Sequence, residues 1–325
     1  MKSFNEITQL VTSELEQLTW NKEPRGLYEP IGYVLSLGGK RIRPALTLMA
    51  CNLFSDDVQP AMNTAIGLEI FHNFTLLHDD IMDKADVRRG QQTVHKKWDD
   101  NTAILSGDVM QIASYQFIAK TPINYLKPVL DLFSQTAAEI CEGQQYDVDF
   151  EQRDVVKGEE YLEMIRLKTA VLLGCALKTG ALIGGAGEAD AQSLYDFGIH
   201  IGLAFQLKDD LLDVYGDEAT FGKKIGGDIL CNKKTYLLIH ALELATGDKA
   251  NELQKWLHIT DHNLANEKIK AVTSLYDQLG VKSICEDKMQ FFYSKAVANL
   301  ENVTVLENKK QELRNLAEKL MFRQE

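Results

Sequence analysis

The placement of proline is the feature of this sequence that most constrains its fold. The chain has 325 residues and six prolines, all of them at or before Pro128. Proline removes a backbone hydrogen-bond donor and breaks the interior of a helix. The long stretch after Pro128 can therefore form uninterrupted helices, and a helical protein is the first expectation.

Apolar residues recur at helical spacing along much of the chain. The pattern covers residues 61–82, 191–214 and 249–322, and it is typical of helices that bury one face. Runs rich in Val, Ile and Thr with strict alternation are scarce, so we predict no sheet. We predict an all-α fold in which residues 1–325 form a single large helical-bundle domain. Loops are expected at 38–39, 55–57, 86–93, 147–158 and 216–228.

The charge and the cysteine content argue against several classes of function. The net charge is −12, which disfavours nucleic-acid binding because that binding depends on neutralising phosphate. The five cysteines are scattered without a CxxC pair, so structural zinc and a disulfide framework are not expected. The apolar stretch 170–187 is interrupted by Lys178, which favours a buried helix over a transmembrane segment. The N-terminus has no apolar signal core, and we predict a cytoplasmic protein.

Two acidic clusters point to the chemistry. Segments 79–83 and 209–213 each read DDxxD. In a helix the first and last aspartates of such a motif share one face, and their repulsion destabilises a bare helix by about 0.2–0.5 kcal/mol. A divalent cation removes this penalty, and Mg²⁺ prefers carboxylate, water and phosphate oxygens. The alternative is a solvated helix end, but each cluster follows an apolar stretch, which favours a metal site.

Basic residues accompany both clusters and indicate a polyphosphate ligand. Residues 38–44 (GGKRIRP) place three positive charges at a predicted helix start, where backbone N–H groups also favour an anion. Arg88 and Arg89 offer guanidinium forks that match phosphate oxygens. His72 lies on roughly the face of Asp79, and a core histidine with a satisfied hydrogen bond is its alternative reading. Walker, dinucleotide-binding and GxSxG motifs are absent from the sequence.

Taken in order, these motifs resemble those of the trans-isoprenyl diphosphate synthases of the polyprenyl synthetase family. The resemblance covers roughly residues 38–235 and is specific because so many short motifs occur together. It implies the isoprenoid synthase fold, a helical bundle around a central cavity, and a homodimer. The matching stretches are GGKRIRP at 38–44, LLHDDIMD at 76–83, RRG at 88–90, GD at 107–108, GQQYD at 143–147, KT at 168–169, FQLKDDLLD at 205–213 and GK at 222–223.

The resemblance also implies a role for each matching residue. Three Mg²⁺ ions would be bound by Asp79, Asp80, Asp83, Asp209, Asp210 and Asp213, which with Arg88 and Lys168 form the catalytic set. Isopentenyl diphosphate would be held by Lys40, Arg43, His72 and Arg89. The allylic prenyl diphosphate would be held by Arg88, Lys168, Thr169, Gln206, Lys223 and Lys233, with Gln144 and Asp147 supporting them.

The implied reaction is a head-to-tail condensation of isopentenyl diphosphate with dimethylallyl, geranyl or farnesyl diphosphate. The growing chain would run from the first cluster along its own helix. Phe74 lies about 7.5 Å before Asp79 along the helix axis, with Phe71 nearly one turn further, and would form a floor beside the small Thr75. This predicts a short all-trans product, with C20 favoured over C15 and a longer polyprenyl product as the alternative.

Other readings fit less well. A terpene cyclase would replace the second DDxxD, and a head-to-head synthase usually has DxxxD units. A non-catalytic subunit of a heteromeric synthase would lose one cluster, and a metal-storage protein has no need of the basic residues. Two positions depart from the family pattern, since Gln92 stands where Pro is usual and Asn232 where many members have Gly. These departures make the 88–95 loop less rigid and weaken the assignment of Lys233.

Overall fold

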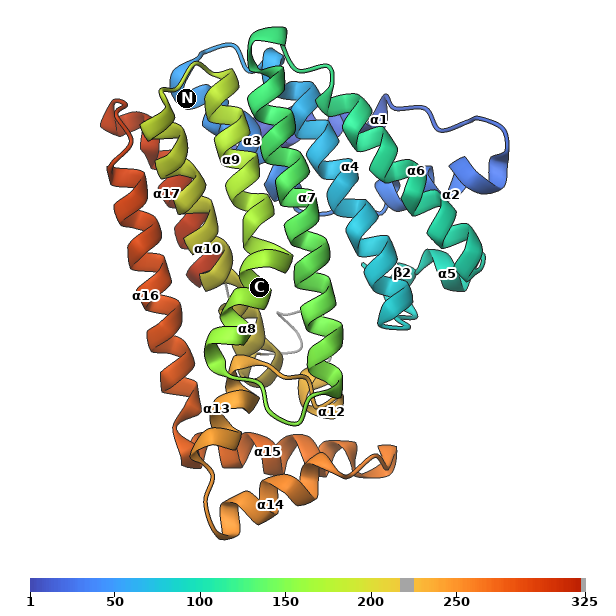
Figure 1. Ribbon diagram of the computed structural model, residues 1–325, viewed down its shortest axis with the longest axis vertical. Coiled ribbons are helices and arrows are strands. Elements are labelled where there is room, and N and C mark those ends of the chain that lie inside the picture. Colours follow the sequence, from blue (N-terminus) through green and yellow to red (C-terminus); the bar gives the residue numbers. More distant parts are fainter. Residues whose placement is uncertain (217–224, 323–325) are drawn as a thin grey trace. The chain divides into compact units, whose positions relative to one another are not determined.

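The computed structural model describes residues 1–216 and 225–322, and most of these residues are helical (Figure 1). The prediction of an all-α fold is therefore confirmed. The chain divides into two compact units. The first unit comprises residues 1–135, 172–195 and 302–313, and the second comprises residues 136–171, 196–301 and 314–325. That residues 1–325 form one domain stays a prediction.

The first unit contains the N-terminal helices and one short hairpin. Its elements are α1 (Phe4–Glu16), α2 (Arg25–Ser36), α3 (Ile42–Phe54), α4 (Gln59–Met82), β1 (Val87–Arg88), β2 (Gln91–Gln92), α5 (Val94–Lys97) and α6 (Asp100–Ile118). Helix α4 packs against α3 and α6. Its buried residues lie on all its sides, as expected of a helix enclosed by others.

The second unit is built from shorter helices and one long one. Its elements are α8 (Gly158–Ile165), the π-helical turn η1 (Arg166–Ala170), α12 (Gly227–Leu230), α13 (Tyr236–Leu244), α14 (Asp248–Leu257), the short 3₁₀ turn η2 (His262–Leu264), α15 (Ala265–Leu279) and α16 (Val281–Glu301). Four further helices contribute residues to both units: α7 (Ile123–Gln152), α9 (Val171–Ile183), α10 (Glu188–Tyr215) and α17 (Glu307–Phe322).

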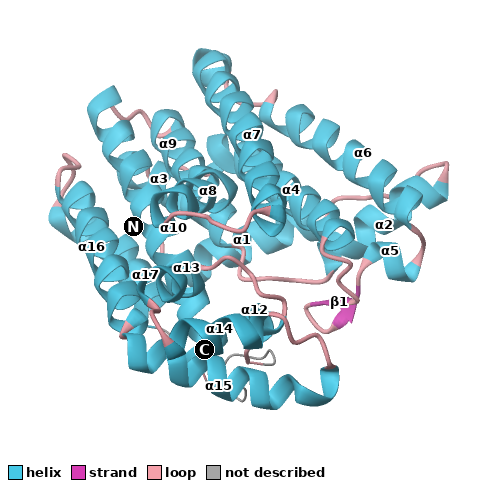
Figure 2. Cartoon of the chain, turned by 60° about the horizontal axis from the view of Figure 1, so that its bottom comes forward, coloured by secondary structure: helices cyan, strands magenta, loops and turns pink. Residues whose placement is uncertain are grey.

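The hairpin β1–β2 corrects the prediction that the chain has no strands (Figure 2). Val87 pairs with Gln92 and Arg88 with Gln91. The two residues between them, Arg89 and Gly90, have φ values of 52° and 74°, as in the tight turns that suit hairpins. Such short strands leave no alternating pattern in the sequence, which is why this segment was predicted as a loop.

The helix boundaries agree with the sequence pattern in most places. The stretches predicted over 61–82 and 191–214 are α4 and α10, and the buried helix predicted within 170–187 is α9. The loop predicted at 147–158 was placed too early, because α7 continues to Gln152. Phe150 is buried there and its ring lies 6.1 Å from that of Tyr146, a pairing one helical turn apart.

The length and composition of the helices also bear on a possible membrane span. Within residues 1–216 and 225–322, no helix is both long enough and apolar enough to cross a bilayer.

Candidate active site

The first aspartate cluster lies at the C-terminal end of α4, which stops at Met82 with Asp83 as its cap. Arg88 reaches it from β1, with Nε and Nη2 at 2.8 and 2.7 Å from Oδ1 of Asp80. The same Nη2 lies 3.8 Å from Oδ2 of Asp79. Burial raises the pKa of Asp80, while the Arg88 guanidinium acts in the opposite direction. The fold thus brings the first cluster and one predicted diphosphate-binding cation together.

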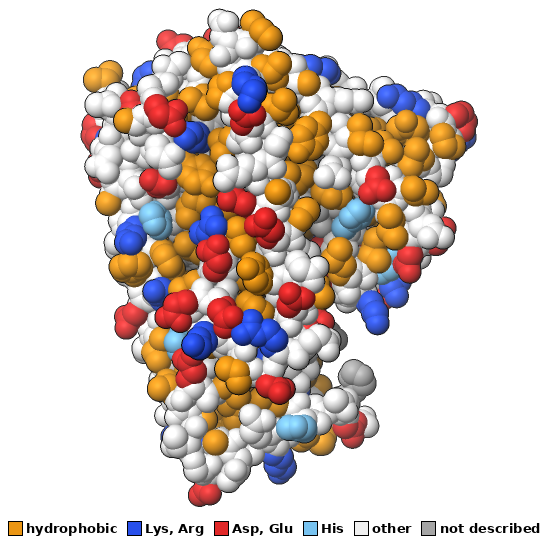
Figure 3. All heavy atoms as spheres, in the orientation of Figure 1, with side chains coloured by type: hydrophobic (Ala, Val, Ile, Leu, Met, Phe, Trp, Pro, Cys, Tyr) orange, Lys and Arg blue, Asp and Glu red, His pale blue; other side chains and the backbone are white. Residues whose placement is uncertain are grey.

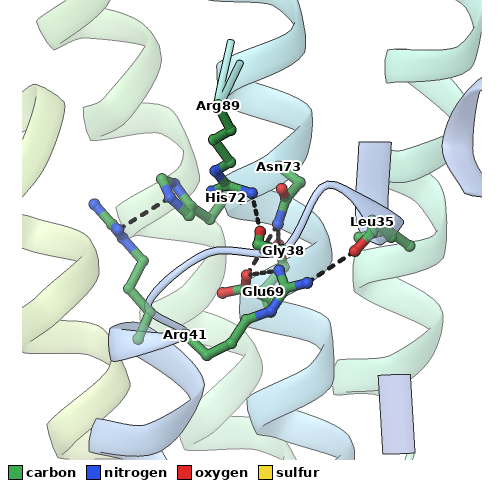
Figure 4. A network of polar contacts seen from close by, with 8 residues as sticks. Leu35, Gly38, Arg41, Glu69, His72, Asn73 and Arg89 are labelled. Atoms are coloured by element: carbon green, nitrogen blue, oxygen red, sulfur yellow. Dashed lines mark hydrogen bonds and ion pairs between the residues drawn. The ribbon is translucent and has the colours of Figure 1, made fainter. Parts of the chain in front are cut away.

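Three of the four residues predicted to hold isopentenyl diphosphate also come together in the first unit (Figure 4). Nη1 of Arg43 lies 3.1 Å from Nε2 of His72. Because arginine can only donate, Nε2 must be the acceptor. Burial and the charges of Arg43 and Arg89 hold the pKa of His72 well below its usual value, so this imidazole is neutral. The fourth residue, Lys40, lies in the exposed loop before α3.

Arg43 has the character of an anion-binding residue. Burial lowers its pKa to about 10, although Glu69 opposes the shift. Among the described residues, its Nε has no hydrogen-bond partner. A partly buried guanidinium with one unpaired N–H favours an incoming oxyanion, because leaving the donor unsatisfied costs free energy.

Arg89 is tied to the loop that carries Lys40. It lies in the hairpin turn, and its Nη1 donates a hydrogen bond to the carbonyl oxygen of Gly38. Gly39 has a φ of 135° and would place a Cβ 2.9 Å from Cζ of Arg89. The backbone conformation therefore favours glycine at this position, and its small size suits the close approach of Arg89.

Arg41 differs from what its position in GGKRIRP suggested. The sequence pattern predicted that it joins Lys40 and Arg43 as one of three charges available to an anion. In the structure its guanidinium is buried and contacts Glu69 and the carbonyl oxygen of Leu35. The Arg41 charge is therefore used within the protein.

The second aspartate cluster lies near the C-terminal end of α10. Asp210 is buried, accepts a hydrogen bond from the Tyr161 hydroxyl at 2.5 Å and contacts Nε2 of Gln206 at 3.5 Å. Oδ2 of Asp213 accepts from the backbone N–H of Asp228 at 3.0 Å. Burial, followed by the nearby Asp228, raises the pKa of Asp210 to about 7 and that of Asp213 to about 6. An added cation would therefore favour the ionised form of both carboxyls.

Lys168 and Thr169 lie on the π turn between α8 and α9. Nζ of Lys168 lies 2.6 Å from Oδ2 of Asp147, and Oγ1 of Thr169 lies 3.4 Å from Oε1 of Gln206. A Cβ at Gly143 would lie 2.3 Å from the backbone nitrogen of Lys168, so the glycine of GQQYD permits α7 to approach this turn. In the second unit the structure thus joins the KT, GQQYD and FQLKDDLLD motifs.

The two remaining lysines have different outcomes. Lys223 lies outside the described residues. Lys233 follows α12, and its charge lowers the pKa of both Asp210 and Asp213 against the larger effect of burial. The preceding Asn232 has a φ of 54°. Asparagine tolerates this left-handed conformation better than most residues, so it replaces the usual glycine here.

The residues predicted to limit product length form an aromatic group in the first unit. The ring of Phe74 lies 5.4 Å from that of Phe71 and 4.8 Å from that of His78. Phe71 also contacts Phe133 on α7, with ring centroids 5.1 Å apart. Thr75 is only partly buried, and its hydroxyl donates to the His72 carbonyl oxygen. The aromatic group therefore extends beyond the two phenylalanines predicted from the sequence.

Some residues that shape the site were not predicted. In the first unit, Glu69 contacts Arg41, and Asn73 donates to Glu69. In the second unit, Tyr161 and Asp228 contact the second cluster. Asp228 lies in a segment predicted as a loop, Glu69 and Asn73 lie within the predicted helical stretch 61–82, and Tyr161 lies in a segment for which no element was predicted. Nothing in their local sequence distinguished them from ordinary helix residues.

Comparison with known proteins gives consistent matches. Residues 24–276 match the polyprenyl synthetase family. A geranylgeranyl diphosphate synthase of Methanosarcina mazei is 41% identical over 236 residues, 72% of each chain. A geranylfarnesyl diphosphate synthase of Natronomonas pharaonis is 39% identical over 244 residues, 70% of this chain and 71% of the relative. The crystal structure of a geranylgeranyl pyrophosphate synthase superposes with a TM-score of 0.95 at 46% identity, covering 99% of both chains.

Proposed function

The chain belongs to the polyprenyl synthetase family and is a trans-prenyltransferase, and on this basis we propose that it makes a C20 prenyl diphosphate from isopentenyl diphosphate and allylic primers in a Mg²⁺-dependent reaction. The observation that carries the proposal is the pairing of acids with cations in both units. Arg88 lies on the first cluster, and the Lys168 turn is joined through Gln206 to the second.

The carboxylates suit Mg²⁺ in chemical type and spacing. Asp79 and Asp83, and likewise Asp209 and Asp213, are one helical turn apart and at least partly exposed, and hard oxygen donors are what this ion prefers. Asp80 and Asp210 are buried and complete the charge of each cluster. We propose that these six aspartates hold three ions. Bound Mg²⁺ would supply positive charge that stabilises the departing diphosphate.

We assign the two substrates to the two groups of cations. Arg43 and Arg89, with neutral His72 and exposed Lys40, would hold the diphosphate of isopentenyl diphosphate. The unpartnered N–H of Arg43 supports this assignment. The allylic diphosphate would be held by Arg88, Lys168, Thr169, Gln206, Lys233 and Lys223, the last of which lies outside the described residues.

The proposed reaction has three steps. The allylic C–O bond breaks and its electron pair leaves with the diphosphate, so that Arg88 and Lys168 face the developing negative charge. The isopentenyl double bond then attacks the allylic cation and forms the new C–C bond. Finally a proton leaves the product cation, with the released diphosphate as the base. No protein nucleophile is required.

A single assay tests the reaction class. The protein is incubated with Mg²⁺, isopentenyl diphosphate and farnesyl diphosphate, and the products are separated by chain length. A linear prenyl diphosphate is expected. A hydrocarbon would indicate a cyclase, and no turnover would indicate a non-catalytic subunit of a heteromeric synthase.

Product length is tested at Phe74. This side chain is 7% exposed and its ring packs against Phe71 and His78, so Phe74→Ala should open the wall and shift the main product beyond C20. Phe292→Ala is the matched control, because Phe292 is 8% exposed and lies on α16. An unchanged product from Phe74→Ala would contradict the assignment of this residue as the floor. The curated relatives include both geranylgeranyl and geranylfarnesyl synthases, so the product must be measured.

We also propose that the protein is a cytoplasmic homodimer. Ile104, Leu105 and Ile112 are exposed on α6, and Figure 3 shows apolar side chains gathered along that helix. Contiguous exposed apolar surface of this kind favours association. Analytical ultracentrifugation should give twice the mass of the chain, and Leu105→Glu should give the monomer.

A further inference from the structure

A buried ion pair lies beneath the loop that carries Lys40 (Figure 4). Nη1 of Arg41 lies 2.5 Å from Oε1 of Glu69, and their side chains are 6% and 2% exposed. Nη2 of Arg41 donates to the carbonyl oxygen of Leu35 at 2.8 Å. The guanidinium therefore joins the end of α2 to the middle of α4, across the start of the loop.

The backbone of this loop has an unusual conformation. Gly38, Gly39 and Arg41 all have positive φ values, of 77°, 135° and 48°. For a residue with a side chain, the left-handed region costs about 1–2 kcal/mol. The two glycines avoid that cost, but Arg41 does not. An opposing interaction must hold Arg41 there, and its contacts to Glu69 and Leu35 are the ones that do so.

Glu69 is itself held in one position. Nδ2 of Asn73, one turn further along α4, donates to its carboxylate at 3.1 Å and to its backbone carbonyl at 2.8 Å. The same carboxylate favours the charged forms of Arg43 and Arg89. A single buried acid thus lies among three arginines, two of which are assigned to the isopentenyl diphosphate site.

Stability alone does not account for this pair. A buried salt bridge is often no more stabilising than well-packed apolar residues of the same size, because desolvating two charges offsets their attraction. Its geometric effect is more specific, since it fixes the residue between Lys40 and Arg43. It also fixes the loop whose Gly38 carbonyl oxygen accepts from Arg89.

We infer that Glu69 and Arg41 are positioning residues for the isopentenyl diphosphate site, holding the 38–41 loop so that Lys40, Arg43 and Arg89 meet one diphosphate. The inference rests on the proposed function, because it takes that site as the destination of those three cations. Neither Glu69 nor Arg41 touches the substrate.

The first test is Glu69→Gln, which keeps the shape of the side chain but removes its charge. The KM for isopentenyl diphosphate should rise about 10-fold or more, which corresponds to the loss of about 1.4 kcal/mol of binding. The KM for the allylic diphosphate should stay within about twofold, since its site depends on other residues. Glu188→Gln is the matched control, because it makes the same chemical change at an exposed acid that pairs with Lys178.

The second test separates positioning from stability. In the double variant Arg41→Leu/Glu69→Leu, both members of the buried pair are removed together, so the melting temperature should recover relative to Glu69→Gln. The isopentenyl KM should remain raised, because nothing then holds the loop. If the KM recovers along with the melting temperature, the pair is merely structural and the inference is overturned.

A third variant, Arg43→Met, checks the underlying site assignment. It should raise the isopentenyl KM by at least as much as Glu69→Gln. If it does not, the proposed site is wrong. If it does while Glu69→Gln leaves the KM unchanged, the site stands and only the inference about Glu69 and Arg41 fails.

Discussion

The two aspartate clusters share one motif but differ in how the protein supports them. In the first, Asp80 is paired with the guanidinium of Arg88, which lies 2.7 Å away. In the second, the hydrogen-bond donors to Asp210 are the hydroxyl of Tyr161 and the amide of Gln206. A backbone N–H serves Asp213 in the same way. The same five-letter pattern therefore gives two electrostatically different sites.

The two clusters differ in how readily their carboxyls are ionised before Mg²⁺ or a substrate binds. A fixed cation favours the ionised form of the first cluster before any ligand binds. In the second cluster, burial outweighs both the uncharged donors to Asp210 and the nearby charge of Lys233, and it raises the pKa of Asp210 to about 7. The second cluster should therefore depend more on added Mg²⁺ and on pH than the first. Substitutions in and around the two clusters test whether they differ in this way.

Loss of the leading aspartate of either cluster should abolish turnover. Asp79→Ala and Asp209→Ala should each reduce kcat by about 1,000-fold or more, because each removes a carboxylate that would hold Mg²⁺ at the departing diphosphate. Circular dichroism should show unchanged helix content. Full activity in either variant would mean that only the other cluster is needed for the reaction.

Removing the fixed cation should have the next largest effect. Arg88→Met leaves Asp80 buried without its guanidinium, and it also removes a proposed allylic ligand. We expect kcat/KM for the allylic substrate to fall about 30- to 160-fold, since a charge-assisted contact contributes about 2–3 kcal/mol. Lys96→Met is the control, because Lys96 makes an exposed ion pair with Asp86. Steady-state kinetics with a varied allylic substrate would check this, and a change of less than threefold would contradict the role.

The Tyr161 hydroxyl should matter less than Arg88, because it is uncharged. Tyr161→Phe removes one hydrogen bond to Asp210 and should reduce kcat by about 10-fold, with a higher Mg²⁺ concentration needed for half-maximal rate. Tyr215→Phe is the control, since that hydroxyl donates to Asp277 instead. Titration of the rate with Mg²⁺ measures the effect. If both variants show the same change in Mg²⁺ dependence, the hydrogen bond from Tyr161 to Asp210 does not contribute to Mg²⁺ binding.

The smallest effect concerns pH and stability without metal. The pKa of Asp210 is about 7 in the folded protein against an ordinary value of 3.8, so the folded state binds the proton more tightly than the unfolded chain. This stabilisation is complete below about pH 4 and is lost as the pH rises through 7.

In EDTA, the free energy of unfolding should therefore fall by about 1 kcal/mol or more between pH 5 and 8. Asp210→Asn should flatten the curve, because it removes the titrating group. Denaturant unfolding at several pH values is the measurement. A wild-type curve that rises over this range would contradict the raised pKa.

Much of the fold followed from local patterns in the sequence. The apolar repeat located α4 within two residues, since periodicity over so many turns is a strong signal. The β1–β2 hairpin was missed because each of its strands has only two residues. The start of the loop after α7 was misplaced because Phe150 continues the buried face of that helix.

The site was predictable only in its charged motifs. Asp79 and Arg88 stand in recognisable motifs. Glu69 and Tyr161, which contact other residues of the site, do not. Glu69 contacts a partner 28 residues away, and Tyr161 contacts one 49 residues away. A sequence read one segment at a time contains no sign of such distant pairings. The chemistry could therefore be inferred from the sequence, whereas the structure was needed to find what holds it in place.

The π turn of Arg166–Ala170 has a consequence for how this chain tolerates changes in length. A π turn accommodates more residues than an α turn, and deleting one residue would restore regular helix geometry. That deletion would also reshape the turn that carries Lys168, and so disturb its ion pair with Asp147. In a library of single-residue deletions, this turn should be a place where the helix is retained while turnover is lost.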